Sequence, residues 1–387
     1  MSMLSTLLRL SRRVRLTNGN SYLNNSYATI AQKPPVKSLV KSSLTGILIG
    51  VLGGTGYYYY VVAKAREEIS LVGSELETPK LSHKPPVTVH RHVVFPIDST
   101  GLKLTLFQYQ TCPFCCKVRA FLDYYGISYD VVEVNPVLRK DLSWSKYKKV
   151  PVLLMKTPDG YQSLQDSTMI VSALKSHLND REHGIDELVQ YYPHIGVRDD
   201  EGKFKYEILN KYFLMFRGDV PQEKKLEELA VERKWRKWAD EVLVHTLSPN
   251  VYRTLDESYE TFRWFSKVGN WEEYFPTWER LLVVNVGATA MWLISKRLKK
   301  RHHLKDDVRA SFYDEINKWV REVNKRGGQF MGGNKPDLSD LAVYGILKSI
   351  EGCRAFKDAL THTKLSTWYN AMTAEIEMNS GSKYLLA

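Results

Sequence analysis

The chain has 387 residues and a formal net charge of +12, but this charge is unevenly distributed. No Asp or Glu precedes Glu67, and the first 66 residues carry nine Lys or Arg, so the other 321 residues hold 46 basic and 43 acidic groups, a net of +3. The basicity belongs to the N-terminal segment, which removes the main argument for nucleic-acid binding. Four cysteines, three of them clustered at 112–116, argue against a disulfide scaffold, and the length suggests two or three domains.

The N-terminal segment has two parts and a connection. Residues 1–43 form a targeting segment, whose first 22 residues are acid-free, rich in Arg and Ser and roughly amphipathic, as mitochondrial transit peptides are. Residues 44–63 are 20 positions without a charge, between Lys41 and Lys64, which predicts one transmembrane helix. Residues 64–100, with Pro79, Pro85 and Pro86, predict a polar stalk. We therefore expect a single-pass protein of a mitochondrial membrane.

Residues 101–180 predict an α/β domain. Expected strands at 104–109, 129–134, 152–155 and 161–164 alternate with expected helices at 113–125 and 167–179, in the order β-α-β followed by β-β-α. This order is that of a thioredoxin-like, glutaredoxin-type domain.

The tetrapeptide Cys112-Pro113-Phe114-Cys115 lies between the first strand and the first helix of this domain. Unpaired N–H groups and the dipole at a helix N-terminus stabilise a thiolate, so we predict that Cys112 is the nucleophile of a redox or thiol-transfer site. The alternative is half of a zinc site. A zinc site needs a second ligand pair, but the other cysteines are the adjacent Cys116 and the solitary Cys353, so we expect no metal.

Two later segments extend this site. Val150-Pro151 opens a buried strand, where a cis peptide is expected and where Val150 would offer its backbone to an extended ligand. Asp166 and Ser167 cap the next helix, whose free N–H groups can bind a carboxylate. Asp166 alone would be a plain N-cap, but with the thiol and the Val-Pro turn it completes the glutathione-binding set of the thioredoxin-like fold.

Residues 181–205 predict a linker, and residues 206–387 an all-α domain. Helices are expected at 206–216, 224–247, 254–266, 277–300, 306–325 and 337–350. An α/β thiol domain followed by an all-α domain is the glutathione-transferase architecture. The apolar stretch 281–294 is too short for a second membrane span and predicts a buried core helix. Arg297 and Arg301, one helical turn apart, mark either a solvated helix end or a clamp for the carboxylates of a fatty acid or a haem.

Several separated motifs resemble one known family. They lie at 107–115, 132–136, 149–151, 191–193, 244–254, 293–298 and 331–333, and are similar to those of the membrane-associated prostaglandin E synthase type 2 family over roughly residues 100 to 380. The resemblance implies an isomerase that converts prostaglandin H2, a lipid endoperoxide, to prostaglandin E2. It also implies a homodimer that binds glutathione together with haem. Family members are often placed at the Golgi membrane, so this location, with a soluble processed form, is the alternative to the mitochondrion.

The resemblance also assigns roles to residues. The catalytic cysteine matches Cys112 and its hydrogen-bonding tyrosine matches Tyr109, which could donate its O–H to the sulfur or to a developing oxyanion. The alternative for Tyr109 is a half-buried aromatic at a strand end. The glutathione contacts match Phe114, Val150, Asp166 and Ser167, and the haem contacts match His245, Ser248, Arg297 and Arg301.

Two functional classes remain open. One is the isomerase of a lipid endoperoxide. The other is a glutathione-dependent thiol oxidoreductase, or a haem- and glutathione-binding protein whose ligand fills the cleft.

Overall fold

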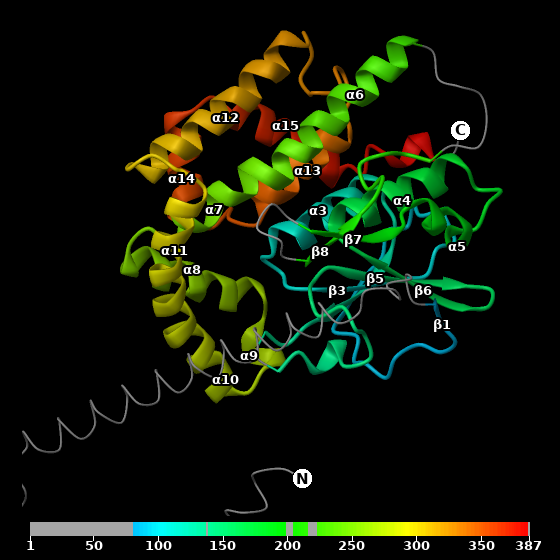
Figure 1. Cartoon of the computed structure of the whole chain (residues 1–387), viewed down its shortest axis with the longest axis horizontal. Helices are drawn as coiled ribbons and strands as arrows, with labels where there is room; N and C mark the ends of the chain where they lie inside the picture. Colours follow the sequence, from blue (N-terminus) through cyan, green and yellow to red (C-terminus); the bar gives the residue numbers. More distant parts are fainter. Residues whose placement is uncertain (1–79, 137, 199–203, 216–222, 386–387) are drawn as a thin grey trace, which may run out of the picture. The chain divides into compact units, whose positions relative to one another are not determined.

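The computed structural model describes residues 80–136, 138–198, 204–215 and 223–385 (Figure 1). The described residues all belong to one compact unit. The predicted targeting segment, the predicted transmembrane helix and residues 64–79 of the predicted stalk lie outside the described residues.

The first half of the described chain forms a six-stranded sheet in the order β1-β6-β5-β3-β4-β2. Strand β3 (Leu104–Gln108) is parallel to β4 (Tyr129–Glu133) and antiparallel to β5 (Val152–Thr157), which pairs with β6 (Gly160–Gln165). The edge strands β1 (Lys80–Leu81) and β2 (Arg91–Val93) pair antiparallel with β6 and β4. The predicted stalk is therefore corrected from residue 80 on, because its end supplies both edges of the sheet. Edge strands of two or three residues carry too little alternation to be recognised in a sequence.

Both faces of the sheet are covered. On one face Leu106, Val131 and Leu153 are buried under the helices α3 (Pro113–Tyr124) and α4 (Ser167–Asn179). On the other face Phe107, Val132 and Leu154 pack against the segment after β4, which contains a short 3-10 helix, Lys140–Leu142. Neighbouring strand residues thus point to opposite sides, as the period of two requires. All the strands and helices predicted for residues 101–180 are confirmed.

The segment between the two halves differs from the prediction. It holds a short helix α5 (Ile185–Leu188), a 3-10 turn (Val189–Tyr191) and a hairpin of β7 (His194–Arg198) and β8 (Phe204–Ile208). The predicted linker is therefore structured in part, and the predicted helix 206–216 is wrong. Asn210 follows β8 with φ of 62°, a left-handed conformation through which a right-handed helix cannot run.

The second half of the described chain is helical, as predicted. Its first helix continues through α6 (Glu223–Trp238), a π-helical segment η3 (Ala239–Leu243) and α7 (Val244–Val251). The others are α8 (Leu255–Val268), α9 (Trp271–Tyr274), α12 (Val308–Lys325), α13 (Leu338–Lys348), α14 (Arg354–His362) and α15 (Leu365–Glu377), with a last 3-10 turn at Ser382–Tyr384. A helix of 25 residues, Thr277–Arg301, comprises α10 (Thr277–Leu282), the π-helical η4 (Val283–Gly287) and α11 (Ala288–Arg301).

The two halves meet where α13 crosses α3 (Figure 1). Gly345 allows the close approach, because a Cβ at this position would lie 2.6 Å from the Cα of Lys117. Beside the crossing, the buried Lys117 ammonium lies 2.5 Å from an Asp240 carboxylate oxygen and donates to the Thr168 hydroxyl at 2.8 Å. Packing and a buried ion pair thus fix the helix that begins after Cys112 against the helical half.

The helix Thr277–Arg301 is not the buried core helix that the sequence predicted. Only 11% of its most apolar 18-residue window is buried, and its length and a mean hydropathy of 1.3 would also suit a membrane span. One side nevertheless packs on the protein. The Ser258 hydroxyl donates to the Ala288 carbonyl, the Ser295 hydroxyl donates to the Tyr252 carbonyl, and Gly287 lies against Phe262. The prediction failed because the helix is apolar on its outer side as well as its inner side.

Candidate functional site

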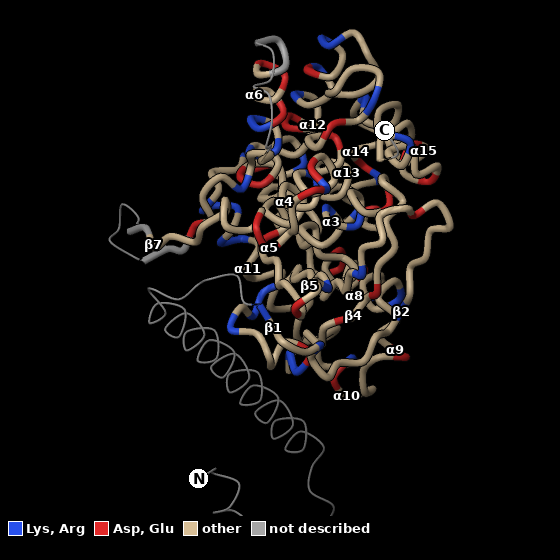
Figure 2. Tube along the Cα trace, turned by 90° about the vertical axis from the view of Figure 1, so that its right-hand side faces the viewer, with Lys and Arg blue, Asp and Glu red and all other residues tan. Residues whose placement is uncertain are grey.

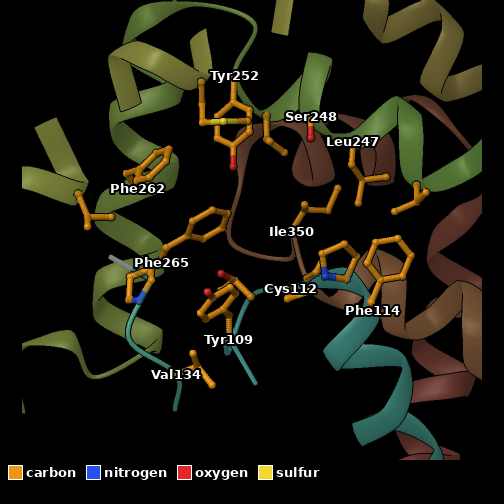
Figure 3. A pocket seen from close by; sticks show the side chains of 18 of the residues that line it. Tyr109, Cys112, Phe114, Val134, Leu247, Ser248, Tyr252, Phe262, Phe265 and Ile350 are labelled. Carbon is orange, nitrogen blue, oxygen red and sulfur yellow. The ribbon is translucent and has the colours of Figure 1, made fainter. Parts of the chain in front are cut away.

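A cavity of about 430 Å³ lies between the sheet domain and the helical half (Figure 3). The sheet domain contributes one end, and the helical half contributes the rest from α7, α8, α9 and the residue after it, the helix Thr277–Arg301 and the two residues after α13. Figure 3 shows Tyr109 and Cys112 between Phe262 and Phe265 on one side and Phe114 and Leu247 on the other. The lining residues are Tyr109, Thr111, Cys112, Pro113, Phe114, Glu133, Val134, Pro136, Val244, His245, Leu247, Ser248, Val251, Tyr252, Phe262, Phe265, Trp271, Phe275, Val283, Met291, Ser349 and Ile350.

Cys112 occupies the N-cap position of α3, is half-buried and lines the cavity. Its pKa is lowered, first by the hydrogen bond that the Cys115 thiol donates to its sulfur and then by the backbone N–H groups of Cys115 and Phe114, while burial acts in the opposite sense. Burial raises the pKa of Cys115 well above its usual value and that of Cys116 to about 11. Among these three thiols, Cys112 is therefore the one available as a thiolate.

Tyr109 follows β3, and its carbonyl accepts a hydrogen bond from the Cys112 N–H at 3.1 Å. This turn brings the phenol and the sulfur to the same end of the cavity (Figure 3). Burial raises the pKa of Tyr109, and the neighbouring Arg139 guanidinium partly opposes the rise. The phenol is therefore protonated at neutral pH and can act as a donor.

The register of the sheet brings the predicted glutathione residues to the same end. Phe107 lies opposite Val152, so the cis Val150-Pro151 peptide that precedes β5 lies beside the loop that leads to Cys112. Val152 in turn lies opposite Gln165, so Asp166 and Ser167 follow at the same sheet end. Phe114 lines the cavity, whereas the other three residues do not.

Asp166 has the geometry of an N-cap. One carboxylate oxygen accepts from the backbone N–H groups of Thr168 and Met169 at 2.8 and 3.3 Å. The other oxygen pairs with the Lys211 ammonium at 3.2 Å. Lys211 comes from the segment after β8, and sequence reasoning missed it because that segment was taken for a helix.

The predicted haem residues are only partly brought together. His245 and Ser248 line the cavity, and the His245 ring stacks on that of His302 with centroids 4.0 Å apart. Burial, and then the nearby Arg301 charge, lower the pKa of His245, so it is neutral at neutral pH. Arg297 and Arg301 are exposed at the end of α11, and the cavity lining contains no Lys or Arg. Haem propionates would therefore have to leave the cavity to meet a guanidinium, so haem fits this cavity less well than a neutral lipid tail does.

Sequence reasoning also missed most of the cavity wall. Phe262, Phe265, Trp271 and Phe275 line the cavity from α8, α9 and the residue after α9, where no motif marks them. Glu133 was missed too, although an acidic residue in the apolar run Val131-Val132-Glu133-Val134 is a signal. Its carboxylate accepts from Arg91 at 2.8 Å and from Gln108 at 2.7 Å, and burial raises its pKa.

Metal chemistry has no obvious site in the part of the chain that the structure describes. Within those residues, no group of three or more His, Cys, Asp or Glu side chains could hold a metal ion.

A thioredoxin-like domain with a cysteine at its first helix, joined to a helical domain across an apolar cavity, defines the glutathione-transferase fold class. The family of glutathione S-transferase N-terminal domains accordingly matches residues 106–182. Among solved structures, the β-etherase LigF from Sphingobium sp. strain SYK-6 aligns with 73% of this chain and 98% of its own, at 16% identity and a TM-score of 0.41.

Curated relatives narrow the class to one family. The Mus musculus protein named Prostaglandin E synthase 2 is 48% identical over 281 residues, which cover 72% of each chain. The Danio rerio protein of the same name is 45% identical over 279 residues, which cover 70% of this chain and 71% of that protein. The chain therefore belongs to the prostaglandin E synthase 2 family, and it is an enzyme.

Proposed function

We propose that this enzyme isomerises prostaglandin H2 to prostaglandin E2 with the thiolate of Cys112. The observation that carries the proposal is an apolar cavity that has a lowered-pKa cysteine and a protonated tyrosine at one end, in a chain of this family. The long apolar wall suits a lipid chain, and the cysteine end suits the reacting ring.

The reaction needs no external oxidant or reductant. The Cys112 thiolate attacks one oxygen of the weak O–O bond, so an S–O bond forms, the O–O bond breaks, and the released oxygen takes up a proton to become the alcohol. The carbon that bears the attacked oxygen then loses its proton to solvent, and the electron pair of that C–H bond forms the C=O bond of the ketone. The S–O bond breaks in the same step and returns the thiolate. Tyr109, which lines the same cavity and is protonated at neutral pH, would stabilise the developing oxyanion by donating its O–H.

We infer that glutathione is the cofactor. Asp166 and Ser167, at the N-terminus of α4, would hold the γ-glutamyl end, the Val150 backbone would hold the cysteinyl part, and Phe114 would flank the thiol. When bound, glutathione supplies a second thiol at the end of the cavity where Cys112 lies.

The experiment is the comparison of Cys112→Ser with Cys115→Ser. Conversion of prostaglandin H2 is measured against its spontaneous decay, with purified protein and added glutathione. Cys112→Ser should abolish formation of prostaglandin E2, whereas Cys115→Ser should keep most of it, because a second cysteine is needed only to resolve a mixed disulfide. Prostaglandin E2 formation that persists in Cys112→Ser would overturn the mechanism.

The second candidate is a glutathione-dependent thiol oxidoreductase, and the pair of Cys112 and Cys115, in which Cys115 lowers the pKa of Cys112, favours it. Such an enzyme would lose disulfide-reducing turnover in both variants, which the same proteins can test. A third, a haem- and glutathione-binding protein, is supported by His245 and Ser248 in the cavity wall. Absorption spectra with and without added glutathione and haemin test it, and an unchanged Soret band on addition of glutathione would contradict haem held through glutathione.

We also propose a single-pass anchor at residues 44–63, a mitochondrial membrane location and a homodimer. The uncharged stretch and the acid-free residues before it support the first two, and family resemblance supports the third. Imaging of the tagged full-length chain tests the location, and finding it only at the Golgi would contradict a mitochondrial address.

A further inference from the structure

Among the described residues that line the cavity, Glu133 alone carries a carboxylate. It is the last residue of β4 and is buried. In the parallel pairing of β3 and β4, Glu133 lies opposite Gln108, the residue before Tyr109. Figure 3 shows Val134, the residue after Glu133, on the same side of the cavity as Tyr109. The carboxylate therefore belongs to the cysteine end of the cavity.

The two oxygens of this carboxylate have different surroundings. Oε1 accepts hydrogen bonds from the Arg91 guanidinium at 2.8 Å and from the Gln108 amide at 2.7 Å. Arg91 comes from the edge strand β2, which lies beside β4 (Figure 2). Oε2 accepts no hydrogen bond from any described residue, and it is not one of the polar atoms that are closed off without a partner. Oε1 thus anchors the side chain, and Oε2 is open to a ligand in the cavity.

The proposed reaction requires a group that takes a proton from carbon. At that step the Cys112 sulfur is bonded to oxygen, so it is not free as a base. Burial lowers the pKa of His245 and so weakens its imidazole as a base. Burial raises the pKa of Glu133, although its hydrogen-bond donors limit the rise, and so strengthens the carboxylate as a base.

We propose that Oε2 of Glu133 takes the proton from the carbon that becomes the ketone, in place of solvent. This inference rests on the proposed isomerase function. The C–H bond breaks and an O–H bond forms on Glu133, while the C–H electron pair forms the C=O bond and the S–O pair returns to the Cys112 sulfur. Glu133 then gives its proton to water. No electron is gained or lost overall, so the step needs no co-reactant.

Loss of this base leaves the sulfur–oxygen adduct a second outcome. The thiol of glutathione attacks the Cys112 sulfur, which forms a mixed disulfide and releases the attacked oxygen as an alcohol. A second glutathione reduces the mixed disulfide, so the endoperoxide leaves as a diol and two glutathione molecules become one glutathione disulfide. The ratio of ketone to diol therefore reports how fast the proton is removed from carbon.

The test is the product ratio of Glu133→Gln, measured with purified full-length protein in detergent micelles, prostaglandin H2 and glutathione. Glutamine keeps an oxygen that accepts from Arg91 and Gln108, but it is not a base. We expect formation of prostaglandin E2 above spontaneous decay to fall by about 100-fold. The diol should become the main product, and the rate of Cys112 alkylation should stay unchanged. A purely structural role of Glu133 would not shift the product ratio in this way.

The matched control is Asp130→Asn, which makes the same chemical change on the same strand. The Asp130 carboxylate contacts Lys84 and His92 and does not line the cavity, so its product ratio should equal that of the unmodified chain. Glu133→Asp guards against a misfolded glutamine variant, because it keeps the charge beside Arg91 and withdraws the carboxylate by one methylene. Its diol share should also rise. A folded Glu133→Gln or Glu133→Asp protein that forms no more diol than Asp130→Asn overturns the proposal.

Cys112→Ser separates this inference from the proposed function. We expect it to form neither product above spontaneous decay, because no sulfur–oxygen adduct arises. Prostaglandin E2 formation that persists in Cys112→Ser would overturn the proposed function and this inference together. If Cys112→Ser is inactive but Glu133→Gln keeps the product ratio of the unmodified chain, only the role of Glu133 is overturned.

Discussion

Removing the Cys115 thiol without replacing it should lower the reactivity of Cys112. The hydrogen bond from Cys115 is the largest cause of the lowered pKa of Cys112. Hydrogen bonds to charged groups contribute about 1.5–3 kcal/mol, which is roughly 10- to 150-fold in the thiolate fraction. Because Cys112 is half-buried, water can replace part of the lost bond. We therefore expect Cys115→Ala to reduce the rate of Cys112 alkylation at neutral pH by about 10- to 30-fold, the lower part of that range.

The assay is the rate of iodoacetamide modification as a function of pH. Burial raises the pKa of Cys115, Cys116 and Cys353, so Cys112 should be the cysteine that reacts first. In Cys115→Ala the pH profile should move to higher pH with the same limiting rate, because the thiolate is destabilised but its access is unchanged. Cys115→Ser is the matched control, since its hydroxyl keeps a donor and the profile should stay near that of the unmodified chain. Equal profiles for Cys115→Ala and the unmodified chain would refute the assignment of the hydrogen bond.

Three further predictions concern the packing behind the site. Lys117→Met should lower the free energy of unfolding by about 3–5 kcal/mol in urea titrations, because it leaves the Asp240 carboxylate buried and unpaired, and adding Asp240→Leu should recover most of the loss. A single variant as stable as the unmodified chain would contradict this. Gly345→Ala should lower the melting temperature, because the added Cβ would meet backbone atoms of Lys117 at 2.6 Å, and this clash outweighs the higher helix propensity of Ala. An unchanged or higher melting temperature would contradict this prediction. Asp340→Ala should lower the free energy of unfolding by about 3 kcal/mol, because the buried carboxylate accepts hydrogen bonds from three backbone N–H groups and from the Trp368 indole N–H. A loss smaller than that for removal of an ordinary N-cap would show that water replaces the carboxylate.

The sequence predicts the cysteine end of the site well because its determinants are local. A strand, a Cys-x-x-Cys and a helix follow one another directly, so the placement of Cys112 at a helix N-terminus needs no long-range contact. Val150 and Asp166 are more distant in sequence, but two antiparallel pairings carry them to the same sheet end once the strand order is known. The local sequence pattern and the sheet register are together enough to predict the cysteine end of the cavity.

The sequence predicts the opposite wall poorly for a physical reason. Phe262, Phe265 and Trp271 lie about 150 residues after Cys112, and their side chains reach the cavity only because the two halves dock. The sequence pattern of an amphipathic helix is the same whether its aromatic residues face a core or a cavity. The exposure of the helix Thr277–Arg301 was missed for the same reason, because the same apolar run occurs in buried and in exposed helices.

Two π-helical segments interrupt the regular periodicity of the helices that line the cavity. An extra residue in a turn rotates everything beyond it by about 100° around the helix axis. Asp240, inside η3, pairs with Lys117 behind the cysteine helix, while His245 and Ser248, only five and eight residues later, line the cavity. The second segment, η4, lies between Leu281 and Arg297, so a count of 3.6 residues per turn cannot be carried from the apolar run to the basic residues. Arg297 and Arg301 lie exposed, while Val283, inside η4, lines the cavity.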